Sequence, residues 1–153
     1  MSILCLRSLR LEDNHFIFKL LNSSGWITFI GDRNIYSPDE ATLYIQKILD
    51  NQNIDYKVIE LKQSKTPIGI ISIVKREELI FRDFGFALLP KYIGKGYARI
   101  ASKFALEELK GETLYAITKE DNVASIKLLK KLGFIHKERI KKDKENLELY
   151  IQI

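Results

Sequence analysis

The sequence has little cysteine and no long hydrophobic run, and each shortage excludes a class of protein. A single cysteine, Cys5, cannot form a disulfide within the chain, which excludes a disulfide-stapled secreted domain. No apolar run reaches the ~18 residues that a membrane-spanning helix needs. The first residues also lack a basic leader followed by an apolar stretch. We therefore expect a cytoplasmic protein that does not enter a membrane.

Metal-binding patterns and repeats are lacking as well. The two histidines, His15 and His136, lie far apart in the sequence, and no cysteine–histidine cluster has the spacing of a metal site. We therefore expect no bound metal. No internal repeat or low-complexity linker divides the 153 residues. That length suits one domain that buries about 68–70% of its unfolded surface, so we predict a single domain over residues 1–153.

The composition is that of a globular protein with a basic C-terminal end. Hydrophobic residues make up 46% of the chain, charged residues 29%, and the net charge is +5. The basic residues near the C-terminus alternate with Glu138, Asp143 and Glu145. Such mixing is typical of a solvated face, and we do not expect nucleic acid as a partner. A weak affinity for a polyanion or the ribosome stays open as an alternative.

Hydrophobic periodicity predicts an α/β or α+β domain with a mixed sheet, because strands precede, separate and follow the helices. The most explicit helix start is Ser37, as N-cap, followed by Pro38 and by Glu40 of a capping box. Residues 23–36 are expected to be a glycine-punctuated loop. Strands are predicted over 3–9, 56–61, 68–74, 79–88, 113–118, 134–140 and 147–153, and helices over 13–22, 37–49, 97–109 and 122–132.

The most informative stretch, residues 84–98, combines a strand, a tight glycine turn and a helix start. Gly94 and Gly96 flank Lys95, so the backbone can approach a ligand closely, and Tyr97 begins the helix. Free N–H groups and the helix dipole at such a point favour a phosphate. Neither well-known phosphate loop fits, because Gly96 replaces the Ser or Thr of a P-loop and Arg99 replaces the third glycine of a dinucleotide fingerprint.

Three segments together resemble the GNAT superfamily of N-acetyltransferases, in its branch of ribosomal-protein N-terminal acetyltransferase-like enzymes. These segments are residues 83–90, 92–98 and 121–134, and a weaker match covers residues 26–33. The resemblance implies a single domain with a central, mixed, mostly antiparallel and twisted sheet of about seven strands, flanked by about four helices. It also implies acetyl-CoA as cofactor, with CoA as product. We expect a monomer or a homodimer.

The resemblance further implies which residues hold the cofactor. The turn would bind the pyrophosphate through main-chain amides, while the later helix would lie against the pantetheine arm. One departure is Ile93, at a position where the family usually has Gln or Arg. Since main-chain amides carry most of the binding, this change would weaken it, with Lys95 and Arg99 nearby in compensation. The expected cofactor-binding residues are Phe86, Leu88, Gly94, Lys95, Gly96, Tyr97, Ala98, Asn122 and Ser125.

The resemblance implies a carboxylate near the strand that precedes the glycine turn, acting as a base directly or through water, and Asp83, just before Phe84, is the best-placed candidate. The alternative is a strand-edge charge or a hydrogen-bond anchor. Leu129 occupies the position of the family's tyrosine acid, so that acid is absent. The resemblance places Trp26, Phe29 and Asp32 over the acceptor pocket, with simple packing as the alternative role. Cys5 lacks a partner histidine, so we expect direct attack by the amine, without an acetylated enzyme.

Three functions remain open from the sequence. The first is acetyl-CoA-dependent transfer to a primary amine, either a protein N-terminus or a small molecule. The second is a CoA-binding regulator with weak or lost catalysis, suggested by Ile93 and Leu129. The third is a basic module associated with ribosome or nucleic acid. The sequence does not identify the acceptor amine.

Overall fold

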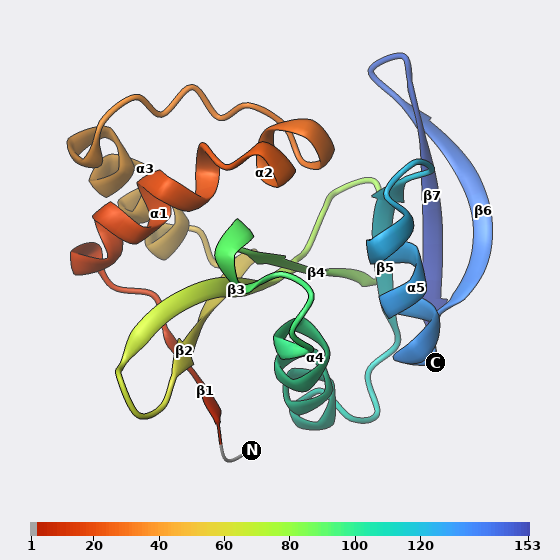
Figure 1. Cartoon of the computed structure of the whole chain (residues 1–153). Coiled ribbons are helices and arrows are strands. Elements are labelled where there is room, and N and C mark those ends of the chain that lie inside the picture. The colour runs from red at the N-terminus through yellow and green to blue at the C-terminus, as the bar shows by residue number, and fades with distance from the viewer. Residues whose placement is uncertain (1–2) are drawn as a thin grey trace.

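The computed structural model describes residues 3–153, whose strands form one sheet of seven (Figure 1). The strand order is β1-β2-β3-β4-β5-β7-β6, and every neighbouring pair in it is antiparallel except β4 and β5, which run parallel. The strands are β1 (Leu4–Ser8), β2 (Ile54–Leu61), β3 (Thr66–Val74), β4 (Arg82–Leu88), β5 (Leu114–Lys119), β6 (Ile135–Lys142) and β7 (Glu145–Gln152). The predicted mixed, mostly antiparallel seven-stranded sheet is confirmed.

Five α-helices and two short 3-10 helices accompany the sheet in the described part of the chain. The additional α-helix, α2, forms inside the predicted 23–36 loop, so that prediction was wrong there. Ser23 caps α2 by accepting a hydrogen bond from the Trp26 N–H at 3.4 Å. The helices are η1 (Leu11–Asp13), α1 (Asn14–Leu21), α2 (Ser24–Phe29), α3 (Pro38–Asp50), η2 (Pro90–Tyr92), α4 (Tyr97–Glu108) and α5 (Val123–Lys131).

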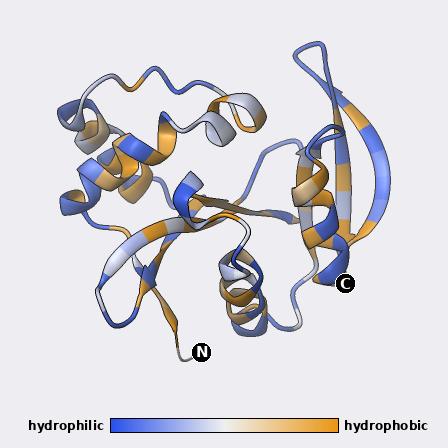
Figure 2. Cartoon of the chain, in the orientation of Figure 1, coloured by the Kyte–Doolittle hydropathy of each residue, from blue (hydrophilic) through white to orange (hydrophobic). Residues whose placement is uncertain are grey.

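Each face of the sheet carries its own hydrophobic core. Because side chains alternate along a strand, neighbouring residues of β3 enter opposite cores: Ile70 packs with α1 and α3, while Ile71 packs with α4 and α5. The α4 side also buries Phe84, whose ring stacks on Phe134 at a centroid distance of 6.1 Å. Hydrophobic and hydrophilic residues accordingly alternate around the helices (Figure 2). No described helix is long and apolar enough to cross a membrane.

The predicted start of α3 at Ser37 is confirmed, with a small difference in its capping. The Ser37 hydroxyl accepts a hydrogen bond from the Glu40 N–H at 3.1 Å. The Glu40 carboxylate, however, accepts from the N–H of Tyr36, at 3.2 Å, rather than from that of Ser37. The acidic side chain therefore satisfies the donor one residue earlier than in the usual capping box.

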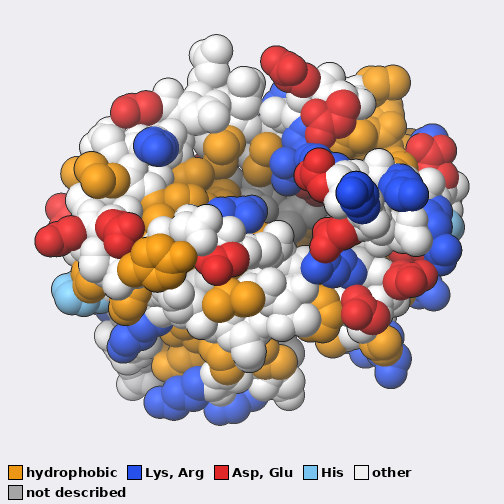
Figure 3. All heavy atoms as spheres, turned by 90° about the horizontal axis from the view of Figure 1, so that it is seen from above, with side chains coloured by type: hydrophobic (Ala, Val, Ile, Leu, Met, Phe, Trp, Pro, Cys, Tyr) orange, Lys and Arg blue, Asp and Glu red, His pale blue; other side chains and the backbone are white. Residues whose placement is uncertain are grey.

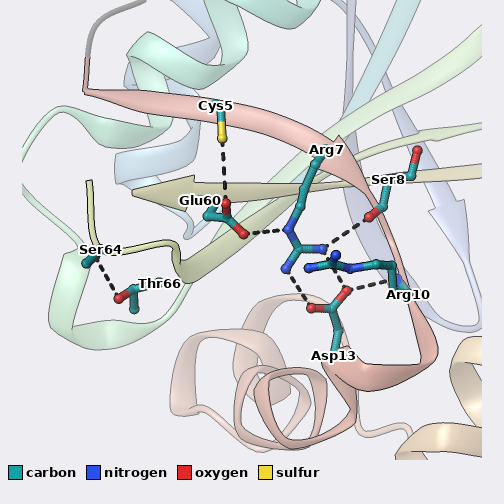
Figure 4. A network of polar contacts seen from close by, with 8 residues as sticks. All are labelled: Cys5, Arg7, Ser8, Arg10, Asp13, Glu60, Ser64 and Thr66. Carbon is teal, nitrogen blue, oxygen red and sulfur yellow. Dashed lines mark hydrogen bonds and ion pairs between the residues drawn. The ribbon is translucent and has the colours of Figure 1, made fainter. Parts of the chain in front are cut away.

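A network of polar contacts joins β1, β2 and the start of α1 (Figure 4). The Arg7 guanidinium donates to both oxygens of Asp13, at 2.9 and 2.7 Å, and to Glu60 at 2.5 Å. Asp13 is only 5% exposed and also accepts from the Arg10 N–H at 2.8 Å. The network therefore fixes the edge strand to the helical layer through charge-assisted hydrogen bonds.

We expect Asp13→Ala to lower the free energy of unfolding by about 2 kcal/mol, because it leaves a partly buried guanidinium with one carboxylate in place of two. Glu107→Ala is the control, since Glu107 and Lys110 form an exposed pair at 3.8 Å and such pairs contribute about 0–1 kcal/mol. Urea denaturation of both variants measures the difference. Equal losses would show that the network adds no stability.

Candidate active site

The candidate site begins where β4 and β5 separate. The two strands pair only through Arg82 with Leu114 and Asp83 with Tyr115. Beyond these pairs the side of β4 that faces β5 has no ladder partner, although its other side stays paired with β3 through Leu88. Backbone N–H and C=O groups need hydrogen-bond partners. Those along the free edge of β4 have no ladder partner on β5, so they can bond to a ligand. Because β4 and β5 are parallel, their carboxyl ends lie at the same end of the sheet.

The glycine turn follows the carboxyl end of β4. Gly94 and Gly96 both have φ of +83°, in the left-handed region that disfavours residues with a Cβ. A Cβ built on either glycine would meet no heavy atom within 4 Å, apart from its chain neighbours. The space in front of the turn is therefore open, and a phosphate can approach the backbone there.

The turn leads directly into the N-terminus of α4. The first hydrogen bond within that helix runs from the Ile100 N–H to the Gly96 carbonyl at 3.1 Å. The N–H groups of Tyr97, Ala98 and Arg99 consequently have no partner within the helix. No side chain caps this end, and no acidic residue lies in its first turn. The exposed Lys95 and Arg99 add positive charge beside a dipole that already favours an anion.

The second predicted block lies at the same end of the sheet, after β5. Asn122 caps α5, its amide oxygen accepting a hydrogen bond from the Ser125 N–H at 3.3 Å. Both side chains are partly buried. Parallel pairing of β4 and β5 thus brings together two segments that are separate in the sequence. Leu129, at the position of the expected tyrosine, is 2% exposed and packs in the α4 side core.

We call the place where β4 and β5 separate, after Asp83, the branch point. Phe86 and Leu88 lie on β4 between the branch point and the glycine turn. Their side chains are partly buried against the α4 side core. The surface that they offer a ligand is therefore mainly the free edge of β4 and part of their apolar side chains. Phe86 and Leu88 thus follow the part of β4 that pairs with β5.

The opposite face of the sheet carries a row of polar and small residues. Tyr56 pairs in register with Ser72, and Ser72 with Gly85, so these positions share one face. A Cβ on Gly85 would lie 2.7 Å from the Ser72 hydroxyl oxygen. Gly85 thus leaves room beside that hydroxyl. The Tyr56 hydroxyl lies 3.1 Å from that of Tyr44, on α3. We call Tyr56, Ser72, Gly85 and Asp83 the polar floor.

Asp83 is the only carboxylate of the polar floor and is 8% exposed. The Arg76 Nε donates to its Oδ2 at 2.9 Å. Burial raises the pKa of the Asp83 carboxyl above its ordinary value, although the charge of Arg76, that of Lys142 and the backbone amide of Ile117 oppose the shift. A buried carboxylate with a raised pKa at a strand branch point is a candidate general base.

The three residues predicted to contact the acceptor lie in and after α2, and they differ in accessibility. Trp26 is 4% exposed and belongs to the core under α1 and α3, with the Arg33 guanidinium 5.9 Å from its ring centre. Phe29 is partly buried. Asp32 is exposed and accepts a hydrogen bond from the Asn34 N–H at 2.8 Å. The position of Trp26 favours packing as its role.

Seen from above, the surface is hollowed between the α1–α3 side and the β5–β7 side (Figure 3). The Lys119 ammonium, on β5, donates to the Thr28 carbonyl of α2 at 2.9 Å and joins the two sides. A separate depression of about 290 Å³, near Lys110 and Gly111 at the far end of α4, involves none of these residues.

Several residues around the polar floor have no sequence signal that could have identified them. Arg76, Tyr44, Tyr56 and Ser72 belong to no motif, and only strand register and loop closure bring them together. The burial of Tyr56 and its neighbour Tyr44 raise the Tyr56 pKa, against the charges of Arg33 and Arg76.

The split between two parallel strands, with an open glycine turn at a helix N-terminus beyond it, is typical of α/β proteins that bind a phosphate-bearing cofactor. The chain belongs to the acetyltransferase (GNAT) domain family, whose profile matches residues 4–135. The predicted superfamily is therefore confirmed, and with it the class of enzyme. The chain matches no curated protein sequence significantly.

Solved structures share the fold at low sequence identity. A spermidine N-acetyltransferase from Vibrio cholerae, in complex with CoA and spermine, has 21% identity and a TM-score of 0.84, over 99% of this chain and 96% of that chain. RimL, a ribosomal L7/L12 α-N-protein acetyltransferase in complex with CoA, has 15% identity and a TM-score of 0.85, over 100% and 95%. The ribosomal-protein-S5-alanine acetyltransferase from Vibrio fischeri has 20% and 0.81, over 100% and 94%.

These structures agree with the prediction of CoA as cofactor, since two of them contain it. They do not confirm the ribosomal-protein branch, because spermidine acetyltransferases have the same fold. At such identities the likeness establishes the fold.

Proposed function

We propose that this protein is an N-acetyltransferase that moves the acetyl group of acetyl-CoA directly onto a primary amine in a ternary complex. The observation that carries this proposal is the glycine turn at the N-terminus of α4, open to a ligand and adjacent to the free edge of β4. The pyrophosphate would bind the main-chain amides of residues 94–98. The pantetheine arm would then run between β4 and β5, along Phe86 and Leu88 and beside Asn122 and Ser125.

The acceptor would approach from the polar floor, on the other face of the sheet. Acetyl transfer requires a neutral amine, and deprotonation at pH 7 costs about 4.6 kcal/mol for a lysine-like amine of pKa ~10.4 but only about 1 kcal/mol for an α-amine of pKa ~7.8. The polar floor has a single carboxylate, Asp83, and it is already paired with Arg76, so it is a weak base for deprotonating a lysine-like amine. We therefore propose an α-amine as the favoured acceptor, the kind of amine that the name of RimL, an α-N-protein acetyltransferase, also specifies.

The test is release of CoA from acetyl-CoA in the presence of a panel of amines. The panel contains short peptides with free N-termini, the same peptides with blocked N-termini and free lysines, and spermidine. We expect turnover with free N-termini to exceed that with the other two classes. Binding of acetyl-CoA without release of CoA for any amine would support the cofactor-binding regulator instead.

Direct attack predicts ternary-complex kinetics, with intersecting double-reciprocal lines. Cys5, the one cysteine of the chain, is partly buried on the edge strand β1, its sulfur 3.8 Å from Glu60 Oε1. Three strands separate β1 from β5, so Cys5 cannot receive the acetyl group at the branch point. We expect Cys5→Ala to keep the turnover of the unmodified protein. Parallel lines, or an acetylated residue that passes its acetyl group to the amine, would contradict direct attack.

A further inference from the structure

The loop between β3 and β4 is shaped so that one of its residues reaches the candidate base. Its backbone is closed by a hydrogen bond from the Leu79 N–H to the Arg76 carbonyl at 3.3 Å, and the Lys75 N–H donates to the Asn53 carbonyl at 2.8 Å. The Lys75 ammonium also donates to the carbonyls of Arg76 and Leu79. These bonds hold the backbone from which the Arg76 side chain extends.

The two side chains of the Arg76–Asp83 ion pair differ in exposure. The Asp83 side chain is 11% exposed and the Arg76 side chain 37%, with 2.9 Å between Nε and Oδ2. An exposed ion pair contributes little, but a buried carboxylate that loses its partner is strongly perturbed. Arg76 therefore matters mainly through its effect on Asp83.

We propose that Arg76 is a positioning residue for acetyl transfer, whose guanidinium holds the Asp83 carboxylate at the branch point of β4 and β5 so that it can take the proton of the acceptor amine. This inference rests on the proposed function and on Asp83 as its base. It assigns a role in the reaction to the β3–β4 loop, which carries no motif of the cofactor or the acceptor.

The charged groups that face Asp83 come from several elements. Arg76 comes from the β3–β4 loop, Lys142 from the end of β6 and the Ile117 amide from β5. Lys142 is shared with Glu78, at 3.3 Å, which weakens its effect on Asp83. Tyr56 of β2 lies near the Arg76 charge. Arg76 is thus the nearest cation and the one with a direct hydrogen bond to Asp83.

Removing the Arg76 charge should leave Asp83 protonated up to a higher pH, because a nearby positive charge favours the ionised carboxylate. For Arg76→Gln we expect kcat/KM for the acceptor to fall about 10- to 100-fold at pH 7, and we expect this loss to shrink as the pH is raised and more of the Asp83 carboxyl ionises. The acid limb of the pH profile should therefore move to higher pH. Arg76→Lys should restore the position of this limb in part.

The matched control is Arg82→Gln. Arg82 is the neighbour of Asp83 on β4, has a side chain 35% exposed, and pairs with Glu112 at 2.6 Å, away from the polar floor. We expect its pH profile to match that of the unmodified protein. The double variant Arg76→Gln, Asp83→Asn should be no slower than Asp83→Asn alone, since Arg76 acts through Asp83.

An NMR titration of the carbon-13 signal of the Asp83 carboxyl tests the same inference without any acceptor. We expect the midpoint to be higher in Arg76→Gln than in the unmodified protein or in Arg82→Gln. Unmoved midpoint and pH profile would overturn the role of Arg76, even if the protein acetylates amines. If instead the protein binds acetyl-CoA and acetylates no amine in the panel, the proposed function fails, whatever the titration shows.

Discussion

A Gly96→Val variant should bind acetyl-CoA at least 100-fold more weakly than the unmodified protein. Gly96 has φ of +83°, a conformation that valine adopts only under strain, and it is the N-cap of α4. No heavy atom of the protein lies within 4 Å of the built Cβ, other than those of its chain neighbours. The added side chain would therefore occupy the open space in which the pyrophosphate must approach the main-chain amides.

The fold offers a close control in Gly111→Val. Gly111 follows α4 at its other end, has φ of +94°, and also has open space around its built Cβ. This variant carries similar backbone strain but lies far along the helix from the glycine turn. Calorimetry should show reduced acetyl-CoA affinity for Gly96→Val and near-normal affinity for Gly111→Val. Equal affinities in two folded variants would contradict the proposed pyrophosphate site.

The order of the seven strands and of α1, α3, α4 and α5 could be predicted because these elements have local signals. Ser37 and Pro38 mark the start of α3, and Gly133 follows α5 with φ of +95°. The predicted start of β4 at residue 79 was three residues early, because residues 79–81 belong to the loop that brings Arg76 to Asp83. Its composition resembles a strand, while its hydrogen bonds close a turn.

The short helix α2 could not be predicted in the same way. It spans six residues, includes Gly25, and contains the β-branched Ile27 and Thr28, so its propensity for helix is low. What holds it is tertiary: Trp26 packs into the core under α1 and α3, and the Lys119 ammonium binds the Thr28 carbonyl. Long-range contacts of this kind leave no periodicity in the sequence.

The residues of the candidate site also fall into those that local sequence patterns predict and those that depend on long-range contacts. Residues of the turn and of the start of α5 could be proposed from the sequence. Glycine there permits a tight turn, and asparagine and serine fit a helix start, so both features appear as short patterns in the chain. The polar floor could not be proposed in this way, since Tyr56, Ser72 and Gly85 become neighbours only through strand register. Chemistry that depends on register is invisible until the sheet is assembled.

Asp83→Asn should lower kcat by about 10²–10⁴-fold while acetyl-CoA affinity stays near that of the unmodified protein. An asparagine keeps the size of the side chain and can still accept a hydrogen bond from Arg76, but it cannot take a proton from the amine. A loss of this size corresponds to about 2.7–5.4 kcal/mol of transition-state stabilisation. The control is Asp55→Asn on β2, whose carboxylate is 46% exposed and lies 3.7 Å from Lys57.

Stability distinguishes a catalytic Asp83 from a purely structural one. Burial raises the pKa of Asp83 in the folded protein, so folding favours its protonated form. The stability it contributes is fully present below the ordinary pKa of an aspartate and is lost as the pH rises through the raised folded value. At pH 7, which is above the ordinary pKa range of a carboxyl group, Asp83→Asn should not lower the melting temperature, because the amide has no charge that burial disfavours.

We therefore expect Asp83→Asn to lose activity and keep its melting temperature at pH 7, the pattern of a residue retained for function at some cost in stability. Asp83→Glu, which keeps the charge but displaces it by one methylene, should retain more activity than Asp83→Asn. A melting temperature that falls together with activity in both variants would assign Asp83 to structure. An unchanged rate at saturating acceptor in folded Asp83→Asn would remove it from the mechanism, because no other carboxylate shares its position on the polar floor.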